Sequence, residues 1–112
     1  MLNYQALKEE LQEVSEFLFV LGDSKRLTII VRLLEESACD GIQVNDLTES
    51  TGLTRPAVSH HLKILRDAKL VDYREEGTKN FYYLNPTNQE IYKLRDFLNK
   101  VIQFTERKEE NV

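Results

Sequence analysis

LTRPAVSHHLKILR, residues 53–66, is the stretch that decides the fold of this chain. Thr54 before the apolar pattern is a natural helix N-cap, and Pro56 falls in the first turn, where a missing N–H costs nothing. Gly52 suits the left-handed residue that closes a preceding helix. The apolar residues then recur at helical spacing and mark one buried stripe: Val58, Leu62 and Leu65. The stretch predicts a helix that follows a tight turn and a second short helix.

The other side of this helix is polar. Ser59, His60 and Lys63 lie opposite the apolar stripe, with Thr54 and Arg55 at the entry. These side chains can donate or accept hydrogen bonds, and because they face away from the core they are not needed for its packing. A short helix of this kind after a tight turn is typical of a helix inserted in the major groove of DNA. The alternative is an ordinary surface helix.

A β-hairpin is expected directly after the helix, at residues 70–84. Two runs rich in β-branched and aromatic residues flank a polar turn that contains Gly77. A two-stranded ribbon is marginal alone, so its apolar face must pack on the preceding helices. The tip, with Arg74 and Lys79, is then free to reach a phosphate backbone. The order helix, turn, helix, hairpin predicts a mainly α fold of the winged helix-turn-helix type, with the helix-turn-helix at 45–66.

Length and composition point to one domain over residues 1–112. The chain has 112 residues, 41% of them hydrophobic, which suffices for a modest core. We find no apolar run long enough to span a bilayer and no leader typical of secretion, so we expect a cytoplasmic protein that does not enter membranes. The single Cys39 cannot form an intrachain disulfide, which agrees with a reducing compartment.

The charge is distributed unevenly along the chain. The net charge is −4, which is unusual for a DNA-binding protein, but residues 54–84 carry six basic against four acidic side chains. This is the only net-positive segment, and it coincides with the expected DNA-binding region. Because the excess is small, we expect nonspecific binding to be weak and sensitive to salt.

Four further helices are predicted by apolar periodicity, at residues 3–21, 24–37, 46–51 and 88–108. Asp23 or Ser24 caps the second of them and Asn45 caps the third, while residues 38–43 form a loop. The first and last helices are more apolar than a small core can absorb. We therefore expect residues 1–21 and 88–108 to form a homodimer interface, the alternative being that they pack only on their own domain.

Three segments of the sequence resemble the ArsR–SmtB family of bacterial winged-helix repressors: LGDSKRLTII at 21–30, VSHHLKIL at 58–65 and GTKNFYYL at 77–84. The resemblance implies a homodimer joined by its first and last helices. It also implies that the dimer binds an operator in double-stranded DNA and is released when a metal ion or another inducer binds. By position, Arg55, Ser59 and His60 match the family's base-contacting residues, and Lys79 matches the basic tip of the wing.

The chain departs from this family at the metal-binding positions. Gln43 and Asn45 stand where many members have a Cys-x-Cys pair, and neutral amides are poor ligands for soft metals. The zinc pattern of the last helix falls on Glu90, Tyr92, Gln103 and Glu106, so neither imidazole is present. We therefore expect no metal site and no cofactor. Cys39 is left as a lone thiol, a kind of residue that is more often structural than a sensor.

These observations favour a sequence-specific DNA-binding regulator, a repressor by the resemblance, that answers to an unidentified small molecule, to a protein partner or to no effector at all. Two alternatives remain: a winged-helix module that binds protein, and a metal- or redox-responsive repressor with an atypical site. We predict no enzyme and no catalytic residue, because no glycine-rich phosphate loop or separable nucleophile set is present. His60 and His61 are adjacent and point about 100° apart on a helix, so they cannot jointly hold one metal, and His61 lies nearer the buried side.

Overall fold

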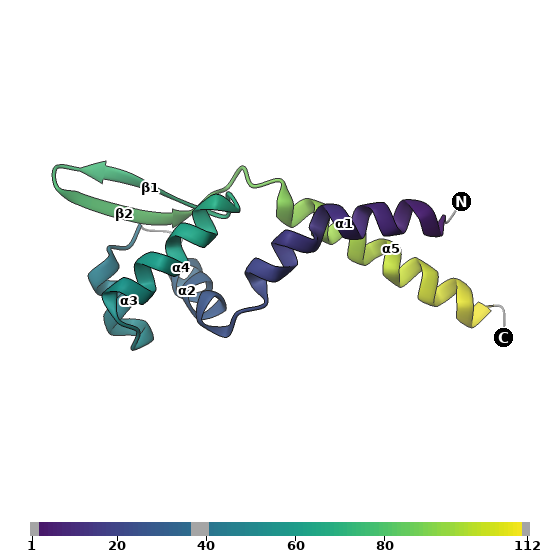
Figure 1. The fold of residues 1–112 in the computed structure, drawn as a ribbon, viewed down its shortest axis with the longest axis horizontal. Coiled ribbons are helices and arrows are strands. Elements are labelled where there is room, and N and C mark those ends of the chain that lie inside the picture. Colours follow the sequence, from purple (N-terminus) through teal and green to yellow (C-terminus); the bar gives the residue numbers. More distant parts are fainter. Residues whose placement is uncertain (1–2, 37–40, 111–112) are drawn as a thin grey trace.

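The computed structural model describes residues 3–36 and 41–110, the last four of them by their backbone alone. The described residues form five helices and one hairpin, which are labelled in Figure 1: α1 (Tyr4–Leu21), α2 (Ser24–Glu35), α3 (Val44–Thr51), α4 (Arg55–Asp67), β1 (Val71–Glu76), β2 (Lys79–Leu84) and α5 (Glu90–Glu110). The predicted fold class, mainly α with a small hairpin in the winged helix-turn-helix order, is confirmed. Cys39 lies outside the described residues.

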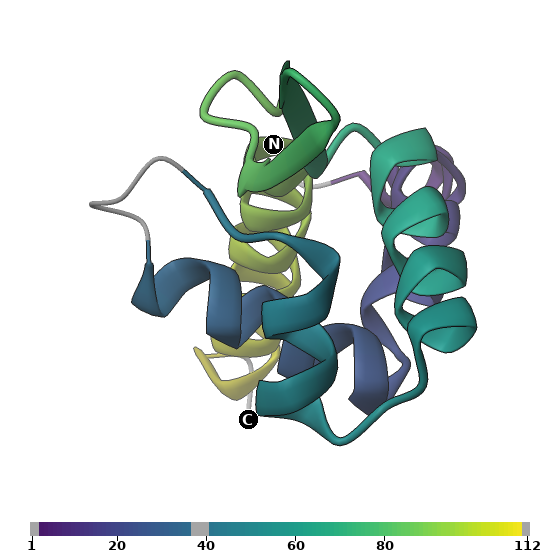
Figure 2. The ribbon, with the colours of Figure 1, turned by 90° about the vertical axis from the view of Figure 1, so that its left-hand side faces the viewer.

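The molecule has an elongated shape, with principal extents of 59 × 25 × 24 Å. We call α2, α3, α4 and the hairpin the body, and the antiparallel pair α1 and α5 the arm. Figure 1 shows the arm projecting from the body, and Figure 2 shows the body end-on with the hairpin along one side of its helices. Within the arm, the rings of Tyr4 and Phe104 lie 4.6 Å apart, and Glu10 forms an ion pair with Lys100.

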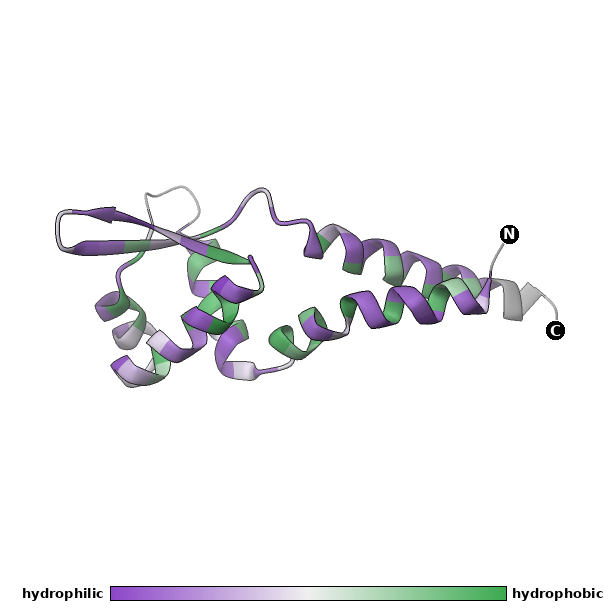
Figure 3. Ribbon diagram, turned by 45° about the horizontal axis from the view of Figure 1, so that its top comes forward, coloured by the Kyte–Doolittle hydropathy of each residue, from purple (hydrophilic) through white to green (hydrophobic). Residues whose placement is uncertain are grey.

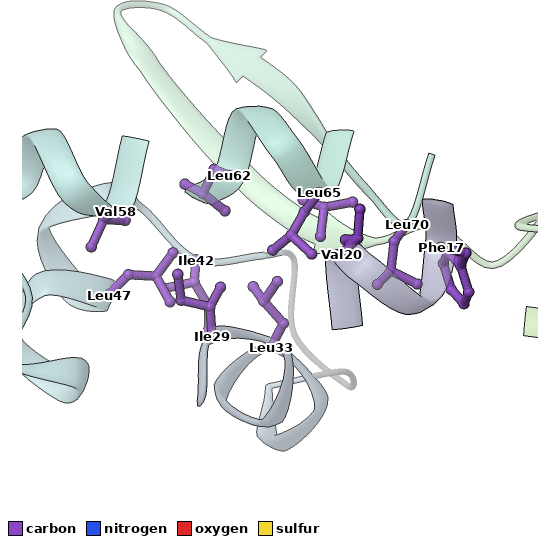
Figure 4. Packing of buried hydrophobic residues seen from close by; sticks show 11 residues of the cluster. Phe17, Val20, Ile29, Leu33, Ile42, Leu47, Val58, Leu62, Leu65 and Leu70 are labelled. Atoms are coloured by element: carbon purple, nitrogen blue, oxygen red, sulfur yellow. The ribbon is translucent and has the colours of Figure 1, made fainter. Parts of the chain in front are cut away.

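The core lies where the three helices of the body meet. Side chains from α2, α3 and α4 converge on it, and α1 adds two residues from its last turns (Figure 4). The most deeply buried members are Ile29, Leu47, Val58, Leu62 and Leu65, each at most 1% exposed. The apolar stripe predicted for α4 therefore fixes that helix against the core and turns its other face outward.

The helix caps agree in part with the sequence predictions. Asp23 caps α2, because its carboxylate accepts from the backbone N–H groups of Lys25 and Arg26, which decides between Asp23 and Ser24. The cap predicted at Asn45 is wrong. Helix α3 begins at Val44, one residue before Asn45, whose side chain instead accepts a hydrogen bond from Arg55 on α4.

The hairpin pairs Val71 with Leu84 at its base and Glu76 with Lys79 at its tip. Val71 is buried and Leu84 packs partly against the core, so the base of the hairpin closes the body on one side. The turn between the strands contains Gly77, whose φ of +63° favours glycine. The expected hairpin and its turn are therefore present.

One strand contact was not predicted. Ile42 forms an antiparallel bridge with Tyr82 through two backbone hydrogen bonds of 2.9 Å each, inside the segment expected to be a loop. Gly41 makes this approach possible, because a Cβ there would lie 2.8 Å from the carbonyl oxygen of Tyr82. Of the loop predicted at residues 38–43, residues 38–40 lie outside the described residues, and Ile42 departs from the prediction by pairing with β2.

Candidate nucleic-acid interface

The turn between α3 and α4 positions the candidate DNA-binding helix. Gly52 ends α3 in the left-handed conformation with φ of +73°. Thr54 is the N-cap of α4, and its hydroxyl accepts from the backbone N–H of Ala57 at 3.3 Å. Pro56 lies in the first turn, as the sequence indicated. These features give α4 a defined start, so the side chains of its first turn are held at one end of the exposed face.

The exposed face of α4 carries the residues that the sequence indicated. Thr54, Arg55, Ser59, His60 and Lys63 are all exposed. Their spacing of three and four residues places most of them along one side of the helix. The opposite side is buried in the core, so α4 cannot rotate about its own axis without exposing apolar surface. The face is therefore both polar and rigidly presented.

Arg55 is tied to the preceding helix. Its guanidinium donates to the side-chain oxygen of Asn45 on α3. An arginine has five N–H donors, so this contact leaves others available to a ligand. The two helices of the helix-turn-helix are thus joined by their exposed side chains as well as by their core residues.

The wing presents its two predicted basic residues differently. Arg74 is half-buried: it pairs with Glu76 at 3.1 Å, and its guanidinium carbon lies 4.8 Å from the ring centroid of Phe81. Lys79 is exposed next to the tip, and it forms no ion pair within residues 3–36 and 41–106. Lys79 is therefore free to meet a phosphate, whereas Arg74 would first have to leave its contacts in the wing.

Arg66 belongs to the same surface and was missed by sequence reasoning. It is exposed and lies seven residues after Ser59 and three after Lys63, which places it on the same side of α4. Its guanidinium carbon lies 4.2 Å from the ring centroid of Tyr73 on β1. The heptad spacing from Ser59 was a signal that could have identified it. Arg66 connects the exposed face of α4 with the wing.

His61 lies on the buried side of α4, as expected. Its Nδ1 lies 3.3 Å from a guanidinium nitrogen of Arg26, which is also buried. Burial lowers the pKa of His61 below its ordinary value of 6.5. His60 is exposed, and the centroids of the two rings are 5.7 Å apart. The two histidines therefore have separate surroundings.

Candidate metal ligands do not gather in the part of the chain that is described. Among these residues, no three His, Cys, Asp or Glu side chains are arranged to hold a metal ion. On α5, Tyr92 is exposed and lies beneath the guanidinium of Arg95, 5.2 Å from its carbon. The expectation for Cys39 falls outside the described residues, and its role stays a prediction.

None of the described helices is long and apolar enough to cross a bilayer.

A helix-turn-helix with an exposed polar face and a basic-tipped hairpin is the architecture of winged-helix DNA-binding proteins. The fold and the site therefore define the class: a winged helix-turn-helix transcription regulator.

Comparison with known proteins identifies the family within this class. Residues 23–73 match the model of the bacterial regulatory proteins of the arsR family. An HTH-type transcriptional regulator of Methanocaldococcus jannaschii is 36% identical over 91 residues, which cover 80% of this chain and 99% of the relative. The arsenical resistance operon repressor of Staphylococcus aureus is 39% identical over 74 residues, covering 66% of this chain and 67% of the relative. The chain belongs to the ArsR family.

The solved structures agree with this assignment. Reduced HlyU from Vibrio cholerae superposes with a TM-score of 0.65 at 27% sequence identity, and the match covers 80% of this chain and 90% of that chain. The similarity spans both the body and part of the arm, because 80% coverage exceeds the length of the body alone.

Proposed function

We propose that this protein is a homodimeric repressor that binds a pseudo-palindromic operator in the cytoplasm. The observation that carries the proposal is the exposed face of α4, where Arg55, Ser59, His60 and Lys63 are presented on a helix fixed by its buried stripe. A helix held in this way can enter the major groove without losing its orientation. The named relatives that are repressors support the direction of regulation.

The side chains of α4 suit different parts of the DNA. Arg55 and His60 can donate hydrogen bonds to acceptors on base edges, and Ser59 can donate or accept. Lys63, as a compact charge on a flexible stem, suits a phosphate oxygen. Thr54 lies at the N-terminus of the helix, where backbone N–H groups also favour a phosphate. Base reading is thus proposed for the first half of α4.

The wing is proposed to contact the DNA backbone. Lys79 next to its tip would bind a phosphate, and Arg74 would do so after leaving Glu76. Phosphate contacts position a protein on DNA without reading its sequence. The wing would therefore add affinity that depends on salt, and α4 would supply the specificity.

The arm supports the proposed dimer. Its outer face exposes Leu11 and Leu18, which lie seven residues apart on α1. It also exposes Ile91, Leu98 and Ile102 on α5, and Figure 3 shows apolar residues along both helices. Soluble monomers rarely leave such stripes in water, whereas a twofold interface would cover them on both copies. A twofold dimer would also place two α4 helices about 34 Å apart, one turn of DNA.

We propose that the effector is not a metal ion bound at either of the family's two usual metal sites, the Cys-x-Cys pair and the zinc site of the last helix. Gln43 and Asn45 offer neutral amides, and Tyr92 and Gln103 stand where imidazoles would be needed. These donor groups bind soft and borderline metals poorly. An organic molecule or a protein partner is the effector that this residue set favours.

The test is a binding measurement on duplexes that the purified protein selects from a random library. We expect the selected duplex to bind more tightly than a scrambled one at about 150 mM salt, by fluorescence anisotropy. H60A should lose about 1–3 kcal/mol of that preference, because it removes a base contact. K8A removes a cation from the arm and serves as the control. Equal binding of selected and scrambled duplexes by the wild type would refute the proposal.

A further inference from the structure

The junction of arm and body contains a buried guanidinium. Arg26, on α2, is only 5% exposed. Its Nε donates to the carbonyl oxygen of Val20 at 2.7 Å, and one terminal nitrogen donates to that of Phe19 at 3.3 Å. Both carbonyls belong to the last turn of α1, where C=O groups lack the usual helical partners, and that of Phe19 also accepts from the N–H of Gly22 at 3.2 Å. Arg26 therefore caps the end of α1 and places a positive charge at the negative end of its dipole.

The same guanidinium reaches α4. Its other terminal nitrogen lies 3.3 Å from Nδ1 of His61 and 3.8 Å from a carboxylate oxygen of Asp23. Arginine can only donate and does not deprotonate in proteins, so Nδ1 of His61 must accept. The proton of the neutral ring then resides on Nε2. One side chain of α2 thus holds the arm by α1 and the DNA-binding helix by His61.

The apolar contacts at this junction do not supply the same constraint. Phe17 and Val20 of α1 pack in the same core cluster as Leu65 of α4. Apolar packing of this kind is favourable but has no preferred direction, so it tolerates small changes of angle. Hydrogen bonds weaken steeply when they are bent, and those of Arg26 join α2 to both α1 and α4. The polar contacts of Arg26 therefore add a directional constraint between α4 and the arm to the apolar packing beneath them.

We propose that Arg26 and His61 are positioning residues that fix the angle between the arm and α4, and so set the spacing between DNA half-sites that the dimer accepts. The inference rests on the proposed function, because it needs a dimer joined by its arms. The buried His61 is the next residue after His60, which lies on the exposed face of α4. A change in the orientation of His61 would therefore move the base-contacting side chains of both copies relative to each other.

The experiment compares H61L with H61Q in the full chain. A glutamine keeps a side-chain oxygen that can accept from Arg26, whereas a leucine fills the space without an acceptor. Each protein is first checked for folding by circular dichroism and for dimerisation by light scattering. Affinity is then measured by anisotropy for three duplexes: the one selected by the wild type, the same duplex with one base pair inserted between its half-sites, and a single half-site. One insertion separates the half-sites by about 3.4 Å.

We expect the wild type and H61Q to prefer the selected duplex over the inserted one by on the order of tenfold, the effect of one mismatched contact. H61L should bind the two within about threefold while keeping its affinity for the single half-site, because its own α4 is still intact. The inference is overturned when H61L keeps the wild-type preference, or when H61Q loses as much of it as H61L. A wild type that does not distinguish selected from scrambled DNA refutes the proposed function itself, and the inference falls with it.

Discussion

The guanidinium of Arg66 lies over the ring of Tyr73, with its carbon 4.2 Å from the ring centroid. This contact joins the exposed face of α4 to the first strand of the wing. The two parts of the candidate DNA-binding surface are therefore linked by a direct side-chain contact in addition to the core beneath them. Their relative position should depend on this pair.

The first prediction concerns this pair. We expect R66A and Y73L to be coupled by about 0.5–1 kcal/mol in the free energy of unfolding, as is typical of a cation over an exposed aromatic ring. Urea denaturation of the wild type, both single variants and the double variant measures the coupling. Additive effects of the two substitutions would show that the contact contributes nothing.

The second prediction concerns the core. L62A removes a side chain that is 1% exposed, and we expect it to lower the free energy of unfolding by about 2–5 kcal/mol, because a cavity remains where the side chain was. Chemical denaturation measures the change. L27A, on the outer side of α2 at 44% exposure, is the matched control and should cost much less. Similar losses for both variants would contradict the assigned core.

The third prediction concerns the arm. L98E places a charge in the outer apolar face of α5, and we expect the dimer dissociation constant to rise by about a hundredfold or more, because an unpaired charge buried in an interface costs several kcal/mol. Light scattering over a dilution series measures it. Q103E adds the same charge at an exposed polar position of α5 and serves as the control. An unchanged dimer in L98E would place the interface elsewhere.

The fourth prediction concerns salt. K79A should reduce the slope of log K against log salt concentration by about one for each tip that contacts a phosphate. It should weaken binding to selected and scrambled duplexes alike, because a phosphate carries no sequence information. Anisotropy at four or more salt concentrations provides the slope. A change in sequence preference without a change in slope would assign Lys79 to base reading.

The fifth prediction concerns pH. Burial lowers the pKa of His61, so the unfolded chain takes up a proton at a higher pH than the folded one. The contribution of neutral His61 to the free energy of unfolding is fully present above the ordinary pKa of 6.5. It is lost as the pH falls from 6.5 through the lower pKa of the folded state. Asp23, Arg26, Lys25 and His60 are the charged or titratable groups that act on this ring.

Melting temperatures of wild type and H61Q measured from pH 8 to pH 5 test this expectation. The wild type should lose more stability than H61Q below the ordinary pKa of 6.5, because the glutamine does not titrate. Parallel curves would mean that His61 takes up its proton equally well when folded.

Much of the fold was predictable because its signals are local. The apolar spacing of Val58, Leu62 and Leu65, the cap at Thr54 and the turn at Gly77 each act within a few residues. The exposed face of α4 followed directly, since a helix with one buried stripe must turn the other side outward. DNA contact by these side chains remains a proposal that the measurements above address.

The features that were missed depend on partners far apart in the sequence. The bridge of Ile42 to Tyr82 joins residues forty positions apart, and nothing in the local pattern of residues 38–43 indicates a strand. Asn45 looks like a cap by its residue type, but its carboxamide serves Arg55 across the turn. Arg26 would normally be assigned to the surface, since a buried arginine needs partners that only the folded chain brings together.

The bridge at Ile42 also has a consequence for the behaviour of the protein at high concentration. It occupies the outer edge of β2 at Tyr82, so the longer free edge of the sheet within the described residues is that of β1. That strand carries charged side chains at four of its six positions: Asp72, Arg74, Glu75 and Glu76. Charges along an open edge discourage a second chain from adding its own strand there. The wing can thus extend from the body without becoming a seed for aggregation.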